Sequence, residues 1–143
     1  MNVATLLKAK GRAVATAHAS TTLLDISVAL SEKRIGAIVI VDDHGGVIGI
    51  VSERDLVRAI ASSGQQVLGR PASEFMTRDV TICSLDRTIE ELMEMMTKGR
   101  FRHLPVVESG NLVGIISIGD VVKHHIAEVE MEVSAMRDYL ATG

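Results

Sequence analysis

The sequence predicts a mixed α/β (α+β) fold made of two similar halves packed as one module, followed by a C-terminal helical extension. A seven-residue segment occurs twice, from Gly49 to Asp55 and, 65 residues later, from Gly114 to Asp120. Each copy follows runs of β-branched residues and precedes a helical pattern. Hydrophobic residues make up 47% of the 143 residues but aromatic residues only 2%, which predicts an aliphatic core.

The first half has the predicted order β-α-β-β-α. Its first helix begins after Thr22, whose hydroxyl suits an N-cap, and it places Leu23, Ile26 and Leu30 on one face. A turn at residues 42–46 joins two apolar runs into a hairpin, and residues 62–66 have the composition of a linker. The first strand is predicted at residues 13–17 and the hairpin strands at residues 35–41 and 47–51. The second helix is predicted at residues 52–62.

The second half repeats this order. Equivalent residues are 66 positions apart before the hairpin turn, as from Thr22 to Thr88, and 65 apart after it, because the second turn is one residue shorter. Two copies of one fold tolerate such a deletion in a loop. Phe75-Met76 corresponds to Leu6-Leu7 near the N-terminus. The short strand is predicted at residues 80–83 and the hairpin strands at residues 104–107 and 112–116. Between them, Asp86-Arg87-Thr88 is predicted to cap a helix whose inner face carries Ile89, Leu92, Met95 and Met96.

These patterns divide the chain into a first repeat at residues 1–66, a second repeat at 67–126 and a helical extension at 127–143. Each repeat is too small to close its own core. We therefore expect a pseudo-two-fold pair in which the two polar loops face a shared cleft.

Composition and charge exclude several classes of protein. A net charge of −3 and the scarcity of aromatic residues argue against binding of nucleic acid. No apolar run is long enough to cross a membrane, and the N-terminus is too polar for a signal peptide. The single cysteine, Cys83, excludes an intrachain disulfide and suits a reducing compartment, so we expect a cytoplasmic location.

The repeated loop places a serine and an aspartate at the start of a helix, where free backbone N–H groups favour anions. The pairs are Ser52 with Asp55 and Ser117 with Asp120. A carboxylate can accept two hydrogen bonds from a cis-diol. Helix capping is the structural alternative for both aspartates, and one side chain can serve both purposes.

The sequence resembles a tandem pair of CBS domains, also called a Bateman module. The resemblance covers residues 1–126 and rests on the doubled G-h-h-S-x-x-D loop, the Thr-opened helix before each hairpin, and the segment RFRHLPVV from Arg100 to Val107. It implies a regulatory homodimer that is not an enzyme. It also implies binding of an adenosine-containing ligand, such as AMP, ADP, ATP, NAD or S-adenosylmethionine, in the cleft between the repeats.

The resemblance also suggests roles for individual residues. The two aspartates would hold ribose hydroxyls and the two serines would approach phosphate. The positive side chains near the loops would meet phosphate oxygens; they are Arg54, Arg100, Arg102 and His103. Adenine would insert between apolar strand ends; the candidates are Thr16, Ala17 and Ile38 in one site and Ile82, Cys83 and Leu104 in the other. Family members often have a proline where this chain has Ala19 and Leu85, and this departure counts against the predicted base contacts more than against the ribose contacts.

No catalytic or metal site is predicted. The adjacent His124 and His125 point about 100° apart on a helix and do not form a paired ligand face. No strained nucleophile elbow supports Ser117 as a catalytic serine. Cys83 lies in an apolar run and is expected in the core rather than as a nucleophile.

The C-terminal extension has a heptad pattern, with apolar residues spaced 3, 4, 3 and 4. The residues of this stripe are Ile126, Val129, Val133, Met136 and Leu140. We expect it to pack on a partner subunit or on the chain's own repeats. The expected function is sensing of an adenine nucleotide, with output to a protein effector in trans. The alternative is a ligand-independent, homodimeric interaction scaffold.

Overall fold

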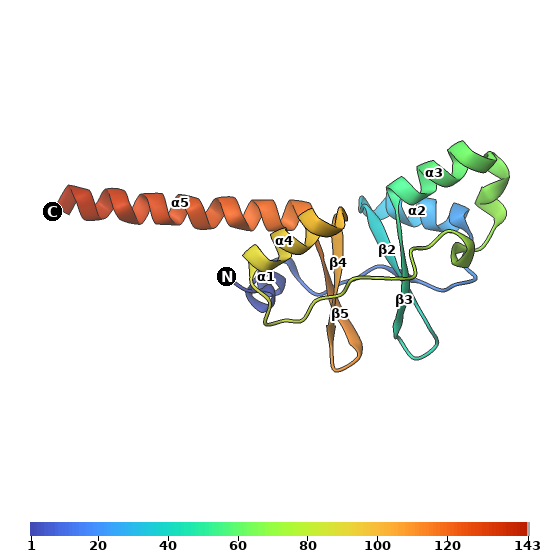
Figure 1. Cartoon of the computed structure of the whole chain (residues 1–143), viewed down its shortest axis with the longest axis horizontal. Helices are drawn as coiled ribbons and strands as arrows, with labels where there is room; N and C mark the ends of the chain where they lie inside the picture. The colour runs from blue at the N-terminus through green and yellow to red at the C-terminus, as the bar shows by residue number, and fades with distance from the viewer. Residues whose placement is uncertain (143) are drawn as a thin grey trace.

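The computed structural model describes residues 1–142, and it contains the two predicted halves side by side with one long helix projecting from the second (Figure 1). The helices are α1 (Val3–Lys10), α2 (Leu23–Lys33), α3 (Glu53–Ser63), α4 (Ile89–Gly99) and α5 (Ile118–Thr142). The strands are β1 (Thr16–Ala17), β2 (Ala37–Val41), β3 (Val47–Ser52), β4 (His103–Glu108) and β5 (Asn111–Ser117). Two short 3₁₀ helices, η1 (Gln65–Gly69) and η2 (Ala72–Glu74), occupy the predicted linker region and the residues after it.

Both predicted hairpins form, but the strand before each is shorter than predicted. β2 and β3 are antiparallel, as are β4 and β5, and β1 adds in parallel to the edge of β2. Only Thr16 and Ala17 of the predicted strand 13–17 are in β1. The strand predicted at residues 80–83 is wrong, because this segment makes a single parallel bridge, between Cys83 and Val106.

Pro105 explains the missing strand of the second half. In the first half, the N–H of Val39 donates to the carbonyl of Ala15 (3.2 Å). Pro105 occupies the position equivalent to Val39 and has no N–H, so it cannot extend the ladder in the same way. The carbonyl of Pro105 still accepts from the N–H of Cys83 (3.0 Å), which leaves only the one bridge.

The helices before the hairpins begin at the predicted caps. The hydroxyl of Thr22 accepts a hydrogen bond from the N–H of Asp25 (3.2 Å), and that of Thr88 accepts from the N–H of Glu91 (3.1 Å). The Glu91 carboxylate in turn accepts from the N–H of Thr88 (3.2 Å), which completes a capping box. Each helix therefore starts where its sequence predicts.

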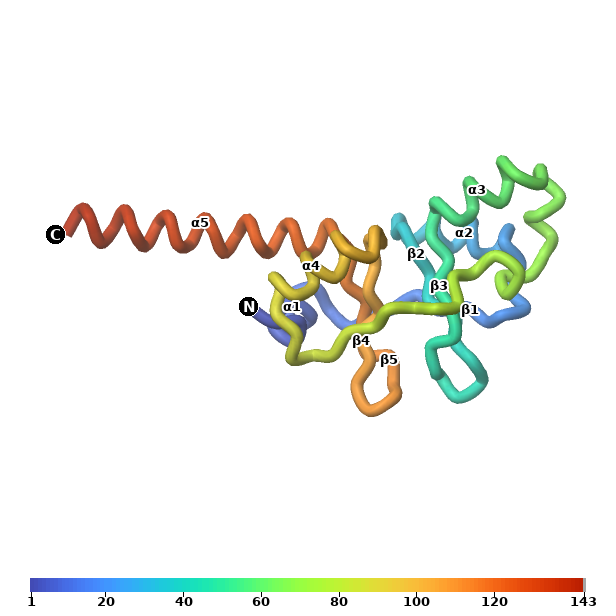
Figure 2. Tube along the Cα trace, in the orientation of Figure 1, coloured from blue at the N-terminus to red at the C-terminus, as the bar shows by residue number. Residues whose placement is uncertain are grey.

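The two hydrophobic cores exchange segments between the halves. α1 buries Val3, Leu6 and Leu7 in the core of the second half, against residues that include Leu92 and Ile116. The core of the first half contains Leu23, Ile38 and Val51, and it is completed by residues that follow α3: Val67, Ala72 and Met76. Figure 2 shows the two connecting segments running in opposite directions between the halves.

The glycine that opens each repeated loop segment makes room for the exchanged segment. A Cβ atom on Gly114 would lie 2.8 Å from Leu7 Cδ1, and one on Gly49 would overlap the Met76 side chain. The predicted correspondence between Leu7 and Met76 is therefore a correspondence of position in two different cores. The division of the chain at residue 66 remains a prediction about sequence repeats.

α5 is continuous from the second repeated loop to Thr142. Val121 is fully buried in the second core, but α5 soon leaves both halves and extends alone (Figures 1 and 2). Among residues 1–142, no helix combines the length and the apolar character that crossing a bilayer requires.

Candidate functional site

Each repeated loop folds into the same hydrogen-bonded unit. In the first copy, the N–H and the hydroxyl of Ser52 both donate to Asp55 Oδ2 (2.9 and 3.0 Å), while the N–H of Asp55 donates to Ser52 Oγ (3.2 Å). In the second copy, Ser117 and Asp120 form the same three bonds at 2.9, 2.9 and 3.1 Å. The structure thus confirms helix capping for both pairs, and in each aspartate it uses only one of the two carboxylate oxygens for the cap.

The loops are also fixed to the hairpins beside them. The N–H of Glu53, at the start of α3, donates to the carbonyl of Gly36 (3.0 Å). The N–H of Ile118, at the start of α5, donates to the carbonyl of Arg102 (2.8 Å). Each helix start therefore lies next to the beginning of its own hairpin, which is where the cationic residues were predicted.

The Asp55 loop opens into a cleft of about 610 Å³ that residues from both halves line, and we call it the Asp55 cleft. It brings together six of the predicted site residues: Ser52, Arg54, Asp55, Arg100, Arg102 and His103. The arginines of the second half therefore meet the aspartate of the first half, across the boundary between the repeats. Three further charged residues line this cleft: Glu53, Arg58 and Asp79.

The Asp120 loop opens into a second cleft of about 530 Å³, the Asp120 cleft. Of the predicted residues it contains Ser117, Asp120 and His103. Its other charged residues come from the first 34 residues of the chain: Lys10, Lys33 and Arg34. Residues of both halves again line the space. Each cleft therefore combines the Ser–Asp loop of one repeat with cationic side chains of the other repeat.

Arg34 and Arg100 occupy equivalent positions in the two clefts. Each follows its helix as the C-terminal cap and has a left-handed backbone conformation, with φ of 52° and 55°. Non-glycine residues adopt this conformation only at a cost of about 1–3 kcal/mol, and such strain is concentrated at functional sites. The two repeats therefore match in their cleft arginines as well as in their Ser–Asp loops.

Lys10 makes the two clefts chemically different. Its ammonium group lies 2.6 Å from Asp120 Oδ2 and donates to the carbonyl of Ile115 (2.6 Å). Burial acts to raise the pKa of Asp120, but the hydrogen bonds from Lys10 and Ser117 outweigh it and hold the pKa below its ordinary value. Asp55 makes no ion pair with any part of the chain that the structure describes.

His103 belongs to both clefts, together with Gly36. Burial lowers the pKa of the His103 imidazole, and the positive charge of Lys10 lowers it further, against the opposing effect of Glu53. The ring is packed closely against Gly36, where a Cβ atom would lie 3.1 Å from Nε2. A neutral imidazole therefore forms the wall between the two clefts at neutral pH.

The residues proposed to contact adenine do not line either cleft. Ile38, Cys83 and Leu104 point into the hydrophobic cores, with at most 5% of each residue exposed. Thr16, Ala17 and Ile82 are more accessible but also lie outside the clefts. Their neighbours take these places: Val14 and Ala15 in the Asp120 cleft, and Val80 and Thr81 in the Asp55 cleft.

The sequence patterns did not predict six charged residues of the clefts; they are Glu53, Arg58 and Asp79 in the Asp55 cleft and Lys10, Lys33 and Arg34 in the Asp120 cleft. Lys10 and Asp79 are each three residues beyond Leu7 and Met76, the residues that the internal correspondence had aligned. That alignment was the available indication that these two residues occupy equivalent sites. It could not indicate which aspartate each would face, because the segments cross to the opposite half.

Cys83 and His125 lie outside the two clefts. Burial raises the pKa of the Cys83 thiol to about 11, as expected of a core cysteine that is not a nucleophile. His125 lies near Glu90 and Glu128, with one potential ligand atom of each within 4.8 Å of the others. Glu128 is already paired with the Met1 amino group (3.0 Å).

Comparisons with known proteins agree with this arrangement. The sequence profile of the CBS domain matches residues 11–62 and 72–126. A CBS-domain-containing protein from Agrobacterium tumefaciens has 46% sequence identity and a TM-score of 0.85, over 87% of this chain and 99% of its own. The chain spans only 21–62% of the length of the first curated relatives it matches.

Two similar structures were solved with ligands. A CBS domain pair in complex with 5′-methylthioadenosine and S-adenosyl-L-methionine has 26% identity and a TM-score of 0.79, over 90% of this chain and 98% of its own. A CBS domain protein from Pyrobaculum aerophilum complexed with AMP has 27% identity and a TM-score of 0.74, over 84% and 89%.

Proposed function

This chain belongs to the CBS-domain family, and from that premise we propose that it is a regulatory module that senses an adenosine-containing ligand. The ligand class is AMP, ADP, ATP, NAD or S-adenosylmethionine, bound in one or both clefts. The observation that supports this most directly is the duplicated Ser–Asp loop, in which each carboxylate faces a cleft lined by cations. The ligands of the similar structures belong to the same chemical class.

The proposed contacts follow from the charges. In the Asp55 cleft, Asp55 accepts hydrogen bonds from the ribose hydroxyls through the oxygen that the cap leaves free. Arg100 and Arg102, which reach this cleft from the second half, contact phosphate oxygens together with Arg54. Ser52 is already bonded within the loop, so its contact with phosphate requires its hydroxyl to turn.

The Asp120 cleft also has a Ser–Asp loop and cationic side chains, but its aspartate is already paired with a lysine. Lys10 neutralises Asp120, so a ribose diol must share or displace that ammonium group. A phosphate in the same cleft attracts Lys10 with Lys33 and Arg34. We therefore expect the Asp55 cleft to accept a nucleoside without phosphate more readily than the Asp120 cleft.

The proposed mechanism is a population shift between relative orientations of the two halves. Because each cleft is lined from both halves, a bound ligand bridges them and stabilises the orientation that it fits best. Its differential affinity for the two orientations limits the size of the shift. The output is a changed surface that an effector protein in trans recognises, in a cytoplasmic homodimer.

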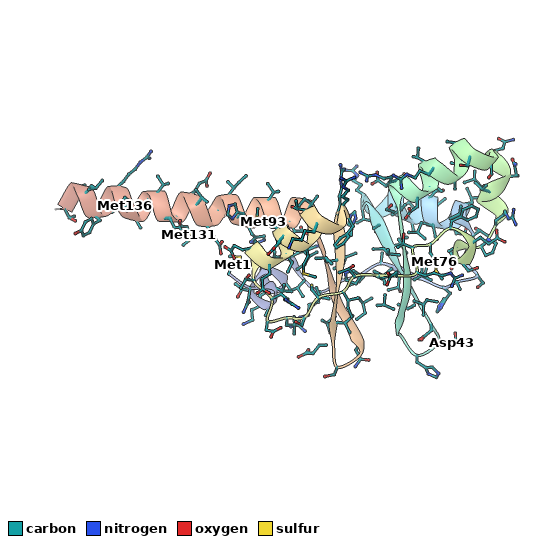
Figure 3. All side chains as sticks on the ribbon, viewed as in Figure 1. Met1, Asp43, Met76, Met93, Met131 and Met136 are labelled. Carbon is teal, nitrogen blue, oxygen red and sulfur yellow. The ribbon has the colours of Figure 1, made fainter. Side chains whose placement is uncertain are left out.

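A thermal-shift panel with AMP, ADP, ATP, NAD and S-adenosylmethionine tests the proposal. A ligand at about 100 times its dissociation constant adds about 2.7 kcal/mol to the free energy of unfolding. We expect a selective rise in melting temperature that falls in Asp55→Asn or Asp120→Asn. Asp43→Asn, in the exposed hairpin turn of the first half (Figure 3), is the matched control and should keep the full rise.

The second candidate function is a ligand-independent interaction scaffold. The observation that favours it is an apolar stripe along α5, which we call the α5 seam. Its residues are exposed; they are Ile126, Val129, Val133, Met136 and Leu140. No thermal shift with any of the five ligands, in protein shown to be free of carried-over nucleotide, would favour the scaffold over the sensor.

A further inference from the structure

α5 presents an apolar stripe that its own chain does not cover. The α5 seam residues Ile126, Val129, Val133, Met136 and Leu140 are between 43% and 69% exposed. Figure 3 shows Met131 and Met136 on the part of α5 that extends away from both halves. The sequence left open whether the seam packs on the chain's own repeats, and in this structure it does not.

The body contacts α5 on a different side. His125 and Glu128 face α4 and the N-terminus, since Glu90 lies near both and the Met1 amino group pairs with Glu128. Ile126 and Val129 follow these residues by one position, which turns them roughly 100° around the helix. The contacts that hold the base of α5 therefore leave the seam free along its whole length.

We propose that the α5 seam binds the same seam of a second copy of this chain in a parallel, two-stranded coiled coil. With Ile126 and Val133 at the a positions and Val129 and Met136 at the d positions, Glu132 is at g and Arg137 is at e. In a parallel pair, residue g faces residue e of the next heptad on the other helix. Glu132 then faces Arg137 of the partner subunit, and this attractive pair occurs twice.

The charges disfavour the other arrangements. Glu132 lies next to Val133, the centre of the seam, so an antiparallel pair that keeps the whole seam in contact brings two copies of Glu132 together. Glu130 and Glu132 also flank the seam with negative charge, which opposes binding to an anionic lipid surface. A second copy in parallel orientation is the partner that satisfies both the apolar stripe and its flanking charges.

Two to three heptads are too few for a stable isolated coiled coil. Here the start of α5 is already fixed, because Val121 is buried in the second core and the Ser117–Asp120 cap holds the first turn. The nucleation cost is therefore met by the fold. The inference concerns only α5 and does not depend on the ligand proposed for the clefts.

Cross-linking of the full chain tests both the surface and the direction. In a parallel pair, two copies of residue 140 are adjacent, whereas in an antiparallel pair centred on Val133 they are about 21 Å apart along the axis, too far for a disulfide. We expect Leu140→Cys to form a disulfide-linked dimer under mild oxidation. Met131→Cys, on the same helix but outside the seam, should not, and the buried Cys83 should not interfere.

Sedimentation equilibrium supplies a second measurement. Met136→Lys should raise the dimer dissociation constant by at least about tenfold, since it places a charge in the seam, whereas Met131→Lys should leave it almost unchanged. Arg137→Glu should weaken the dimer, and Glu132→Arg with Arg137→Glu should restore it. The proposal is overturned if Leu140→Cys and Met131→Cys cross-link equally, if neither does, or if the double exchange fails to restore association.

Discussion

The aspartate of each repeated loop takes part in a helix cap and also lines a cleft. Asp55 and Asp120 each use one carboxylate oxygen to complete a helix cap and face a cleft that cations line. Capping therefore does not exclude the proposed binding at these positions. An experiment can remove one part of the cap alone, because a serine-to-alanine change removes the hydroxyl and leaves in place the carboxylate that the proposed ribose contact requires.

Ser52→Ala should lower the free energy of unfolding by about 0.5–2 kcal/mol, the usual cost of losing an N-cap. The hydroxyl accepts from the N–H of Asp55, which loses that partner in the variant. Urea denaturation followed by circular dichroism measures the change. Ser134→Ala, at an exposed position of α5, is the control and should be neutral; equal effects at the two positions would contradict the capping role.

His103 should make stability depend on pH. Its pKa is lower in the folded protein than its ordinary value of about 6.5, so the unfolded chain takes up the proton first as the pH falls. The contribution is therefore fully present above that value and is lost as the pH falls through it towards the folded pKa. Melting temperatures between about pH 7.5 and 5.5 should fall less for His103→Gln than for the unmodified protein. A parallel decline in both would show that His103 is not the titrating group.

At the scale of secondary-structure elements, the exchanged segments decide how the repeats fit together. α1 fills the second core although it opens the chain, and Met76 fills the first core although it precedes the second hairpin. Close packing at Gly114 and Gly49 fixes where each segment lies. Each repeated loop therefore needs its glycine because a larger residue would collide with the crossing segment. The backbone conformation at these positions does not require glycine.

Gly114→Ala should lower the free energy of unfolding by about 1–3 kcal/mol, because the new methyl group meets Leu7 in a closely packed core. In a Leu7→Ala background, which provides space, the same change should cost less. A double-mutant cycle in urea measures this coupling. Gly69→Ala has open space around it and serves as the control. Additive costs for Gly114→Ala and Leu7→Ala would show that the two do not interact.

At the scale of the whole molecule, the exchange should make the two halves unfold together. Each core requires a crossing segment: α1, from the start of the chain, completes the second core, and residues 67–76 complete the first. We expect one transition in urea, with circular dichroism and amide resonances of both halves giving the same midpoint. Leu6→Ala, in the second core, should lower the free energy of unfolding by about 2–5 kcal/mol. The common urea midpoint should therefore fall equally for both halves. Separate midpoints would mean that the halves are independent.

The same exchange explains how ligand binding can act on the whole molecule. Both clefts are lined from both halves, and His103 with Gly36 belongs to each. A change in the relative orientation of the halves therefore alters both clefts at once. This is the property that the proposed sensing mechanism requires.

The sequence by itself determined the elements and the repeated loops. The caps at Thr22 and Thr88, both hairpins and the Ser–Asp pairs depend on residues close together in the chain, and local hydrogen bonding and periodicity are sufficient to place them. The exception is the strand at residues 80–83. Its loss depends on Pro105, a residue of the neighbouring strand that local propensity does not consider.

Only the tertiary structure decided which residues share a cleft. Lys10 reaches Asp120 because α1 crosses to the second half, and Arg100 joins the Asp55 cleft because the two halves lie side by side (Figure 1). The proposed adenine contacts illustrate the same limit: apolar strand residues such as Ile38 and Leu104 turn into the cores, while their neighbours face the clefts. Periodicity predicts that a strand has two faces, but the packing of the two halves determines which face a ligand can meet.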